Sequence, residues 1–241
     1  MVKGLLLLLC LLLGCTPALA AVEAVTVRHG DRNSPKIAIT IDDCYDSDHI
    51  QSAIELCETY GIRVTFFPIG KALKFADGPL WQRALDAGCE IGNHSWGHTN
   101  LTRLSTRDVR YQMLRTQQKI DEMLGYHYPM QVMRPLMGVT NGKVEDAVGS
   151  VGYLAVVRWD VSQTNAKKAI KDVQNGSILL YHARAKDIKC LRVLIPQLLE
   201  KGYECVTVSE LLGFEPVEIE NWIYDYEPDH ATTGIFARGE S

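Results

Sequence analysis

The residues best suited to chemistry in this chain are two histidines four positions apart. His94 and His98 lie in the stretch EIGNHSWGHTNLT, residues 90–102, which is otherwise small and polar. Two imidazoles at this spacing can share one side of a helical turn and bind one metal ion. An isolated pair more often belongs to a solvated surface, so residues elsewhere in the chain must decide between the two interpretations.

Two adjacent carboxylates, Asp42 and Asp43, follow the apolar run KIAITI. Either could simply cap the next helix. Neighbouring carboxylates behind a buried strand are costly, however, unless something positive faces at least one of them, and a metal ion meets that need. We therefore interpret Asp43, His94 and His98 as a metal-binding set with open coordination positions, as a hydrolytic site requires. Zn²⁺ is the default ion, and Co²⁺, Mn²⁺, Ni²⁺ or Fe²⁺ would also suit mixed nitrogen and oxygen ligands.

These residues must be positioned by a chain in which β-branched apolar runs alternate with polar segments of helix length. Seven such strand–helix units predict a parallel sheet with helical crossovers, either an open doubly wound sheet or a closed barrel. The predicted strands cover 36–41, 63–69, 89–94, 130–134, 153–159, 177–182 and 203–208. The predicted helices cover 48–61, 79–88, 105–125, 143–148, 165–173, 188–201 and 209–213.

The unusual polar residues all fall at the carboxyl ends of these strands, where parallel α/β folds build their sites. Arg134, Trp159, Asp160 and His182 end strands four, five and six and join the aspartates and histidines above. Each has a structural alternative: Arg134 could be an ion-pair partner, and His182 a satisfied core histidine. The remaining histidines lack such neighbours and are interpreted as surface residues: His29, His49, His127 and His230.

Length and composition bound the remaining possibilities. The chain has 241 residues, 46 % of them hydrophobic, and a net charge of −4, which fits one globular domain. Without a basic field, nucleic acid is not an expected partner. The five cysteines beyond the leader are odd in number and unlike a zinc ribbon, so we expect small buried hydrophobes. A single disulfide, for instance between Cys190 and Cys205, is the alternative.

The first twenty residues have the features of a targeting segment. Lys3 precedes a short leucine-rich run, and Ala18-Leu19-Ala20 offers a cleavage site. A competing interpretation takes Leu12-Leu13-Gly14-Cys15 as a bacterial lipobox, in which Cys15 would carry the only membrane anchor. Either way, we expect a secreted or envelope-associated protein. At the other end, residues 214–241 form an acidic, aromatic extension that either packs on the core or hangs free.

Four motifs resemble those of the polysaccharide deacetylases, also called NodB-homology proteins or family-four carbohydrate esterases. TIDD (40–43) is similar to the first motif, and EIGNHSWGH (90–98) matches the second almost letter for letter. MRPLMG (133–138) stands at the Arg-x-Pro-Tyr-Gly motif, and GSILLYH (176–182) at the motif that brings the catalytic histidine. The resemblance covers 36–213, within a catalytic domain assigned to 30–213. It implies an α/β fold, a distorted barrel of about seven parallel strands.

The resemblance also implies roles. Asp43, His94 and His98 would hold the metal, and Asp42 would be the general base that activates water. His182 would be the general acid that protonates the departing amine or alcohol, and Arg134 would orient Asp42.

Two motifs depart from the family pattern. The third has Leu136 and Met137 where Pro and Tyr are usual, although Met137 still offers a backbone N–H to an oxyanion. A further family motif, usually Asp-x-x-Asp-Trp and located before the histidine motif, appears as SQTNA (162–166), with Asn165 and Ala166 in place of the Asp-Trp pair. Asn165 would support His182 without a negative charge. Together with Trp159, these positions would form the oxyanion site and the substrate wall.

The leading hypothesis is an exported, metal-dependent hydrolase that removes acetyl groups, N-linked or O-linked, from a polysaccharide such as peptidoglycan or a chitin-like glycan. The altered motifs leave two alternatives open. One is a catalytically impaired envelope protein that binds glycan, and the other is a deacylase or amidase for a non-sugar substrate.

Overall fold

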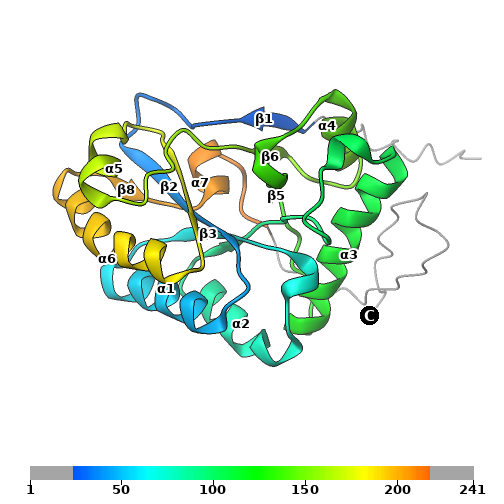
Figure 1. Ribbon diagram of the computed structural model, residues 1–241, viewed down its shortest axis with the longest axis horizontal. Coiled ribbons are helices and arrows are strands. Elements are labelled where there is room, and N and C mark those ends of the chain that lie inside the picture. The colour runs from blue at the N-terminus through cyan, green and yellow to red at the C-terminus, as the bar shows by residue number, and fades with distance from the viewer. Residues whose placement is uncertain (1–23, 218–241) are drawn as a thin grey trace, which may run out of the picture.

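The structure, a computed structural model, describes residues 24–217 (Figure 1). The expected leader at 1–20 and all but the first four residues of the extension at 214–241 lie outside them. The described residues form eight strands: β1 Val25–Val27, β2 Lys36–Asp43, β3 Val64–Pro68, β4 Glu90–Ile91, β5 Val132–Met133, β6 Ala155–Val157, β7 Ile178–His182 and β8 Glu204–Cys205. The α-helices are α1 Ser47–Tyr60, α2 Gly78–Asp86, α3 Thr106–Leu124, α4 Gly142–Gly149, α5 Ala166–Asp172, α6 Ala185–Glu200 and α7 Val208–Leu212. Four short 3₁₀ turns are η1 Gly70–Ala72, η2 Phe75–Asp77, η3 Leu101–Arg103 and η4 Leu136–Gly138.

The strands form two parallel sheets that join into a distorted barrel. One sheet has the order β4-β3-β2-β7 with β8 paired to the beginning of β2, and the other has the order β1-β6-β5. Isolated parallel bridges, Asn93 with Met133 and Val161 with Leu179, link the sheets on both sides. This closed arrangement confirms the predicted barrel over the open sheet.

Side chains along the strands point alternately into two hydrophobic clusters, an inner core inside the barrel and an outer core beneath the helices. In β2, Ile37, Ile39 and Ile41 belong to the cluster beneath the helices, whereas Ala38 belongs to a second cluster formed by the opposite strand faces. Because successive side chains point to opposite faces, Thr40 and Asp42 share the inner face with Ala38. Residues of α7 complete the inner cluster. The inner face of β2 therefore runs from an apolar filling to a carboxylate at its carboxyl end.

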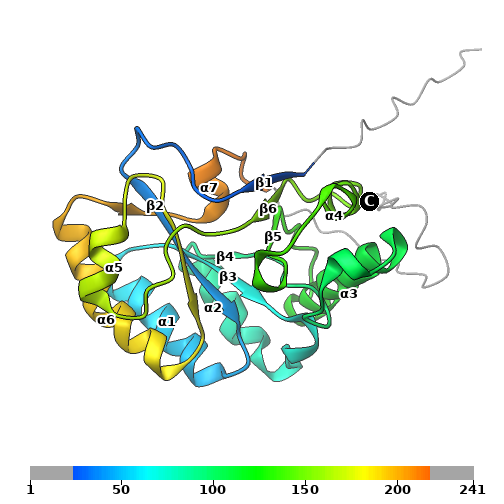
Figure 2. The ribbon, with the colours of Figure 1, turned by 45° about the horizontal axis from the view of Figure 1, so that its top comes forward.

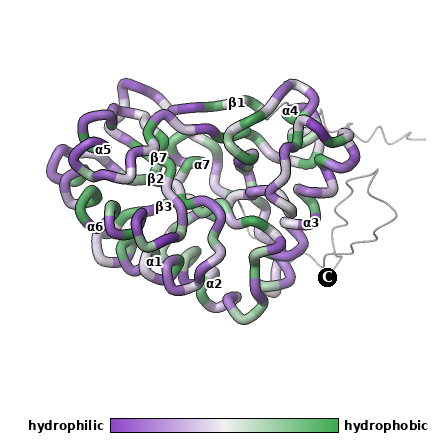
Figure 3. The backbone as a smooth tube through the Cα atoms, viewed as in Figure 1, coloured by the Kyte–Doolittle hydropathy of each residue, from purple (hydrophilic) through white to green (hydrophobic). Residues whose placement is uncertain are grey.

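The helices surround the barrel in chain order. Contacts run from α5 to α6, α6 to α1, α1 to α2, α2 to α3 and α3 to α4. Figure 2 shows α1, α2 and α6 side by side on the outside of the long strands. Hydrophobic segments gather toward the centre of the molecule, whereas hydrophilic segments dominate its rim (Figure 3). Side-chain caps begin several of these helices, for example Asp46 before α1 and Thr207 before α7. Among residues 24–217, no helix has both the length and the apolar character needed to cross a membrane.

Several predicted boundaries differ from the structure. The strands expected at 89–94, 130–134 and 153–159 shrink to two or three paired residues, since the chain bends away to build loops. The short β1, which pairs with β6, was not predicted, and it lies before residue 30, where we placed the start of the domain. Helix α6 begins at Ala185 rather than Ile188.

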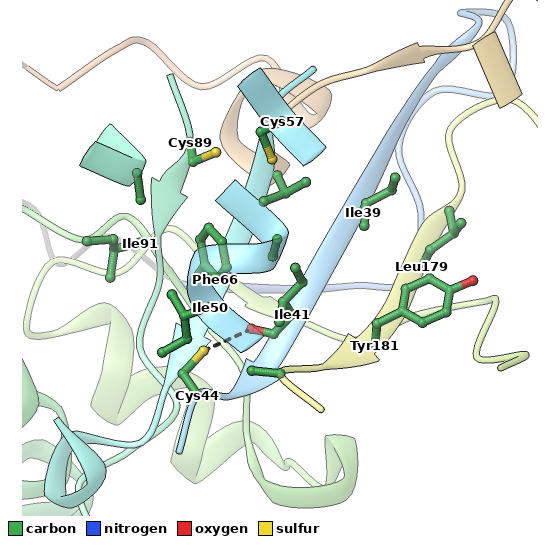
Figure 4. Packing of buried hydrophobic residues seen from close by; sticks show 14 of the residues in the cluster. Ile39, Ile41, Cys44, Ile50, Cys57, Phe66, Cys89, Ile91, Leu179 and Tyr181 are labelled. Carbon is green, nitrogen blue, oxygen red and sulfur yellow. Dashed lines mark hydrogen bonds between the residues drawn. The ribbon is translucent and has the colours of Figure 1, made fainter. Parts of the chain in front are cut away.

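The cysteines and one histidine complete the comparison. All five cysteines of the described chain are free and buried, which confirms small buried hydrophobes and excludes the Cys190–Cys205 disulfide in this structure. Figure 4 shows Cys44, Cys57 and Cys89 in the outer core, with the Cys44 thiol 3.6 Å from the Ile41 carbonyl oxygen. The surface interpretation of His127 is wrong: it is buried, and its Nδ1 lies 2.7 Å from a carboxylate oxygen of Asp121.

Candidate active site

The carboxyl ends of β2 and β7 place two of the predicted residues side by side. Asp42 and His182 are direct partners in the parallel register of these strands, and both lie on the inner face. The Asp42 carbonyl accepts a hydrogen bond from the N–H of Ala183, 3.3 Å away, which continues the pairing beyond the strand. Segments far apart in the chain thus bring a carboxylate and an imidazole to one opening.

Arg134 holds the Asp42 carboxylate from inside the barrel. Its side chain is fully buried, and its Nη1 donates to Asp42 Oδ1 at 2.7 Å and to Thr40 Oγ1 at 2.6 Å. Nε and Nη2 donate to the backbone carbonyls of Val157 and Arg158. Burial lowers the pKa of the Arg134 guanidinium, and the Asp42 carboxylate opposes this shift. One oxygen of Asp42 is therefore engaged by a fixed donor, while the other faces the histidines.

His94 and His98 do not lie on a helical turn. The chain leaves β4 and forms a loop in which Ser95 N–H donates to Asn93 Oδ1 at 2.8 Å and His98 N–H donates to Ser95 Oγ at 3.1 Å. This loop places the two imidazole centroids 4.7 Å apart. Side-chain-to-backbone hydrogen bonds, rather than helical periodicity, produce the juxtaposition.

Asp43 faces both rings. Its Oδ1 lies 3.7 Å from His94 Nε2 and 3.7 Å from His98 Nε2, and its Oδ2 lies 4.0 Å from His182 Nε2. Donor atoms of Asp43, His94 and His98 all lie within 4.8 Å of one another. Among the described residues, the recorded partners of this carboxylate are imidazoles and not permanent cations, so the group has the composition and compactness of a cation site.

The tautomer of His94 and the burial of His98 both suit metal ligands. His94 Nδ1 lies 2.6 Å from the backbone carbonyl of Arg134, which places the proton on Nδ1 and leaves the Nε2 lone pair facing Asp43. Burial and the neighbouring His94 ring lower the pKa of His98, against the opposite influence of Asp43. The first feature fixes the tautomer of His94 and the second favours a neutral His98, and both fit a bound divalent cation.

Backbone conformation marks the same region. In residues 24–217, the non-glycine residues with positive φ are Asp43, Cys44, Ser95, His98 and Met137. All five lie in the segments that hold the predicted ligands or the third motif. Such conformations are uncommon for residues with a Cβ and concentrate at functional sites, because the surrounding structure must hold them. We take this clustering as independent support for a site at this end of the barrel.

The substrate wall was predicted to include Met137 of the third motif and Trp159. Met137 lies in η4 with a φ of 54°, and its side chain is 77 % exposed. Trp159 is half-buried, and the guanidinium of Arg134 lies 5.7 Å from its ring. A Cβ on Gly138 would lie 3.1 Å from the Trp159 ring, so this glycine permits close packing of the two segments. The segment thus combines an exposed apolar side chain at Met137 with close packing of Gly138 against Trp159.

The side chains of two residues predicted near the site make their hydrogen bonds elsewhere. Asn165 is exposed, and its side chain caps α5 by accepting from Lys168 N–H, so the expectation that it supports His182 is wrong. Asn often takes this capping position because its oxygen satisfies a free helix N–H. Asp160 instead pairs with Arg32 and accepts from the N–H of Ile178, at the beginning of β7 and away from the site.

Sequence reasoning missed the carboxylate that does lie beside His182. Asp187, in the first turn of α6, is 2 % exposed, and its Oδ2 lies 3.4 Å from His182 Nδ1. The predicted helix began one residue later, which left Asp187 without a structural role. An acid soon after a strand-end histidine, at the start of a helix, is the signal that was available.

Comparison with known proteins agrees with the barrel. The sequence profile of the family described as Polysaccharide deacetylase matches residues 29–156, which include Asp42, Asp43, His94, His98 and Arg134. The chain belongs to the polysaccharide deacetylase family. The match stops before β7, so His182 is placed by the structure and not by the family profile.

Two curated relatives illustrate the family. The chain is 30 % identical over 204 residues to the peptidoglycan-N-acetylglucosamine deacetylase PgdA of Listeria monocytogenes, covering 80 % of this chain and 42 % of the relative. It is 31 % identical over 191 residues to the peptidoglycan-N-acetylmuramic acid deacetylase PdaC of Bacillus subtilis, covering 75 % of this chain and 39 % of the relative. The chain thus spans well under half the length of these two relatives.

A solved structure shows the same fold. A family-four carbohydrate esterase pseudoenzyme from Bacillus anthracis superposes with a TM-score of 0.71 at 22 % identity, covering 81 % of this chain and 71 % of that one. The distorted barrel described above is therefore the fold of the family.

Proposed function

We propose that this polysaccharide deacetylase family member is an exported, metal-dependent hydrolase that removes acetyl groups from an N-acetylated glycan such as peptidoglycan. The observation that carries the proposal is the convergence of Asp42, Asp43, His94, His98 and His182 at one end of the barrel. The names of the curated relatives, both peptidoglycan deacetylases, support the reaction and the substrate class. The leader features of residues 1–20 support export.

Asp43, His94 and His98 would hold the divalent cation, with Zn²⁺ as the first candidate. A cation held there would supply Lewis acidity toward the acetyl carbonyl. The backbone carbonyl of Arg134 fixes a proton of His94 on Nδ1, the nitrogen that faces away from the site, so that Nε2 is the atom that would bind the cation.

Asp42 is suited to accept the proton of the attacking water. Its Oδ1 is held by the Arg134 guanidinium, while its Oδ2 lies 3.8 Å from His94 Nε2 and so faces the candidate cation site. The carboxylate is nearly fully buried, and its orientation is therefore set before substrate arrives. Fixed orientation of this kind lowers the entropic cost of reaching the reactive geometry.

His182 is suited to protonate the leaving amine. Its side chain keeps 29 % of its surface exposed, and its Nε2 points toward Asp43 from the strand adjacent to the base. An amine departs poorly as an anion, so a proton donor on this flank is required. The base and the acid thus come from neighbouring strands, with the candidate cation site close to both.

The test is acetate release by the purified protein from N-acetylglucosamine oligomers and from peptidoglycan, with added Zn²⁺ or Co²⁺. We expect metal-dependent release that falls by at least 10²-fold in Asp42→Asn. The matched control is Asp108→Asn, which changes an acid in the first turn of α3 that bonds to Ser105 and lies in no predicted motif.

Two outcomes would contradict the proposed function and support a different one. Glycan binding without turnover of any acyl substrate, unchanged by Asp42→Asn, would identify a binding protein. Release of acetate from small aryl esters but never from oligosaccharides would identify a deacylase for a non-sugar substrate. Metal analysis of wild-type protein against His94→Ala separately tests the ligand assignment.

A further inference from the structure

A buried acid next to the candidate general acid has no assigned role. Asp187 is the third residue of α6 and is 2 % exposed. A carboxylate is seldom buried to this degree unless it is paired or hydrogen-bonded. Its partners therefore indicate what it does.

The contacts of the Asp187 side chain within the described residues are made by one carboxylate oxygen. Oδ2 accepts a hydrogen bond from the backbone N–H of His182 at 2.9 Å, lies 3.4 Å from His182 Nδ1, and lies 3.4 Å from Nε of Arg184. The Arg184 side chain is 58 % exposed, so this contact is screened by solvent. The enclosed contacts are the two with His182.

The imidazole of His182 consequently lies between two carboxylates. Nδ1 faces Asp187 at 3.4 Å, and Nε2 faces Asp43 at 4.0 Å. A histidine that gives a proton from Nε2 needs Nδ1 to carry its own proton afterwards, because the neutral ring holds only one. A carboxylate at Nδ1 favours that tautomer and restricts rotation of the ring.

Local structure explains why Asp187 can occupy this place. The strand β7 ends at His182, and α6 begins at Ala185 after a two-residue turn in which Arg184 N–H donates to the His182 carbonyl at 2.8 Å. A carboxylate in the first turn of a helix is favoured by the exposed N–H groups there. The turn folds this first helical turn back over the end of the strand, onto the backbone and ring of His182.

We propose that Asp187 is the positioning residue for His182: it holds the proton on Nδ1 and aims Nε2 into the opening. This inference rests on the proposed function for its catalytic consequence. Asn165 stands at the position where the family's motif has its supporting aspartate, but it is exposed and caps α5 instead. In this chain the supporting carboxylate therefore comes from the helix that follows the histidine.

The experiment compares Asp187→Asn and Asp187→Ala with wild type on two substrates. An N-acetylglucosamine oligomer needs its leaving amine protonated, whereas para-nitrophenyl acetate releases a stabilised phenolate that does not. We expect kcat on the oligomer to fall about 10–100-fold, with KM and metal content within about twofold of wild type. Turnover of the aryl ester should stay within about twofold. The control Asp108→Asn, again a first-turn acid, should leave both activities unchanged.

A double variant separates positioning from general structural damage. In a His182→Ala background, Asp187→Asn should cause no further loss of kcat, because the group that it positions is absent. Equal losses in both backgrounds, equal losses on both substrates, or a wild-type kcat in Asp187→Asn would each overturn the proposal.

A second measurement does not depend on turnover. Long-range proton–nitrogen NMR correlations, assigned by comparison with His182→Ala, report which nitrogen of the neutral His182 ring carries the proton. We expect the Nδ1–H form in wild type and a shift toward the Nε2–H form in Asp187→Ala. The same tautomer in both proteins would overturn the proposal even if the protein had no acetyl substrate. Absent turnover by wild type with the expected tautomers would instead refute the proposed function.

Discussion

Replacing Arg134 with methionine tests how the candidate base is held. The guanidinium is fully buried and donates to Asp42 Oδ1 at 2.7 Å, to Thr40 Oγ1 at 2.6 Å and to two backbone carbonyls. Its Cζ also lies 4.4 Å from the Phe67 ring centroid. Methionine fills much of the same volume but removes the charge and all of these donors.

The expected cost follows from what remains behind. Asp42 is 4 % exposed, so Arg134→Met leaves a buried carboxylate that has lost its guanidinium partner. Removing one member of a buried ion pair costs about 3–5 kcal/mol, mostly as the penalty on the unpaired charge. If that is the source of the loss, neutralising Asp42 as well should restore part of the stability. We expect the double variant Arg134→Met/Asp42→Asn to have a free energy of unfolding about 1–3 kcal/mol higher than the value predicted by adding the losses of the two single variants.

The assay is urea unfolding of metal-free protein in the presence of a chelator, followed by tryptophan fluorescence and circular dichroism. Metal must be absent because a ligand that binds only the folded state would add its own stabilisation. A loss below about 1 kcal/mol in Arg134→Met, or strict additivity in the double variant, would refute the reasoning that this ion pair supports the inner face of the barrel.

Four further outcomes follow from particular residues. Gly92→Ala should cost about 1–3 kcal/mol in urea unfolding, because the new Cβ would lie 2.5 Å from a Phe67 ring carbon. Gly142→Ala, with no atom within 4 Å of the new Cβ, should instead be neutral or stabilising. Burial raises the pKa of Glu90 above 4.5, so the folded state binds this proton more tightly. Stability should then fall as pH rises from 4.5 through the raised pKa, and unfolding of Glu90→Gln across this range should lack that fall. When Zn²⁺ is present at about 100 times its Kd, its removal should lower the free energy of unfolding of the wild-type protein by about 2.7 kcal/mol. The same removal should leave the free energy of unfolding of His98→Ala unchanged.

Local sequence patterns were sufficient to place most elements. Runs such as KIAITI and SILLYH carry the period and composition of buried strands, and their polar neighbours mark where the strands end. Because every strand of the barrel is parallel, polar residues at the carboxyl ends meet on one face whatever the exact neighbours are. For this reason Asp42, Asp43 and His182 could be assigned to one opening from the sequence.

Short strands and loops were less predictable. The paired lengths of β4, β5 and β6 depend on where partner strands end, which no local pattern contains. The spacing of His94 and His98 suggested a helical turn, but backbone N–H groups that donate to the side chains of Asn93 and Ser95 hold a loop instead. The spacing thus predicted the proximity of the rings and not the backbone that produces it.

The sequence by itself determined the order of the elements, the face on which chemistry gathers and the residue types available there. Only the tertiary structure decided which side chain lies beside His182. Both Asn165 and Asp187 are near enough in sequence to contact His182. The Asn165 side chain caps α5 instead, whereas the tight turn after β7 brings the Asp187 carboxylate to His182. Spacing along a strand is set by covalent geometry, but a contact between a strand and a helix depends on the turn between them and on the alternative hydrogen-bond partners that each side chain finds.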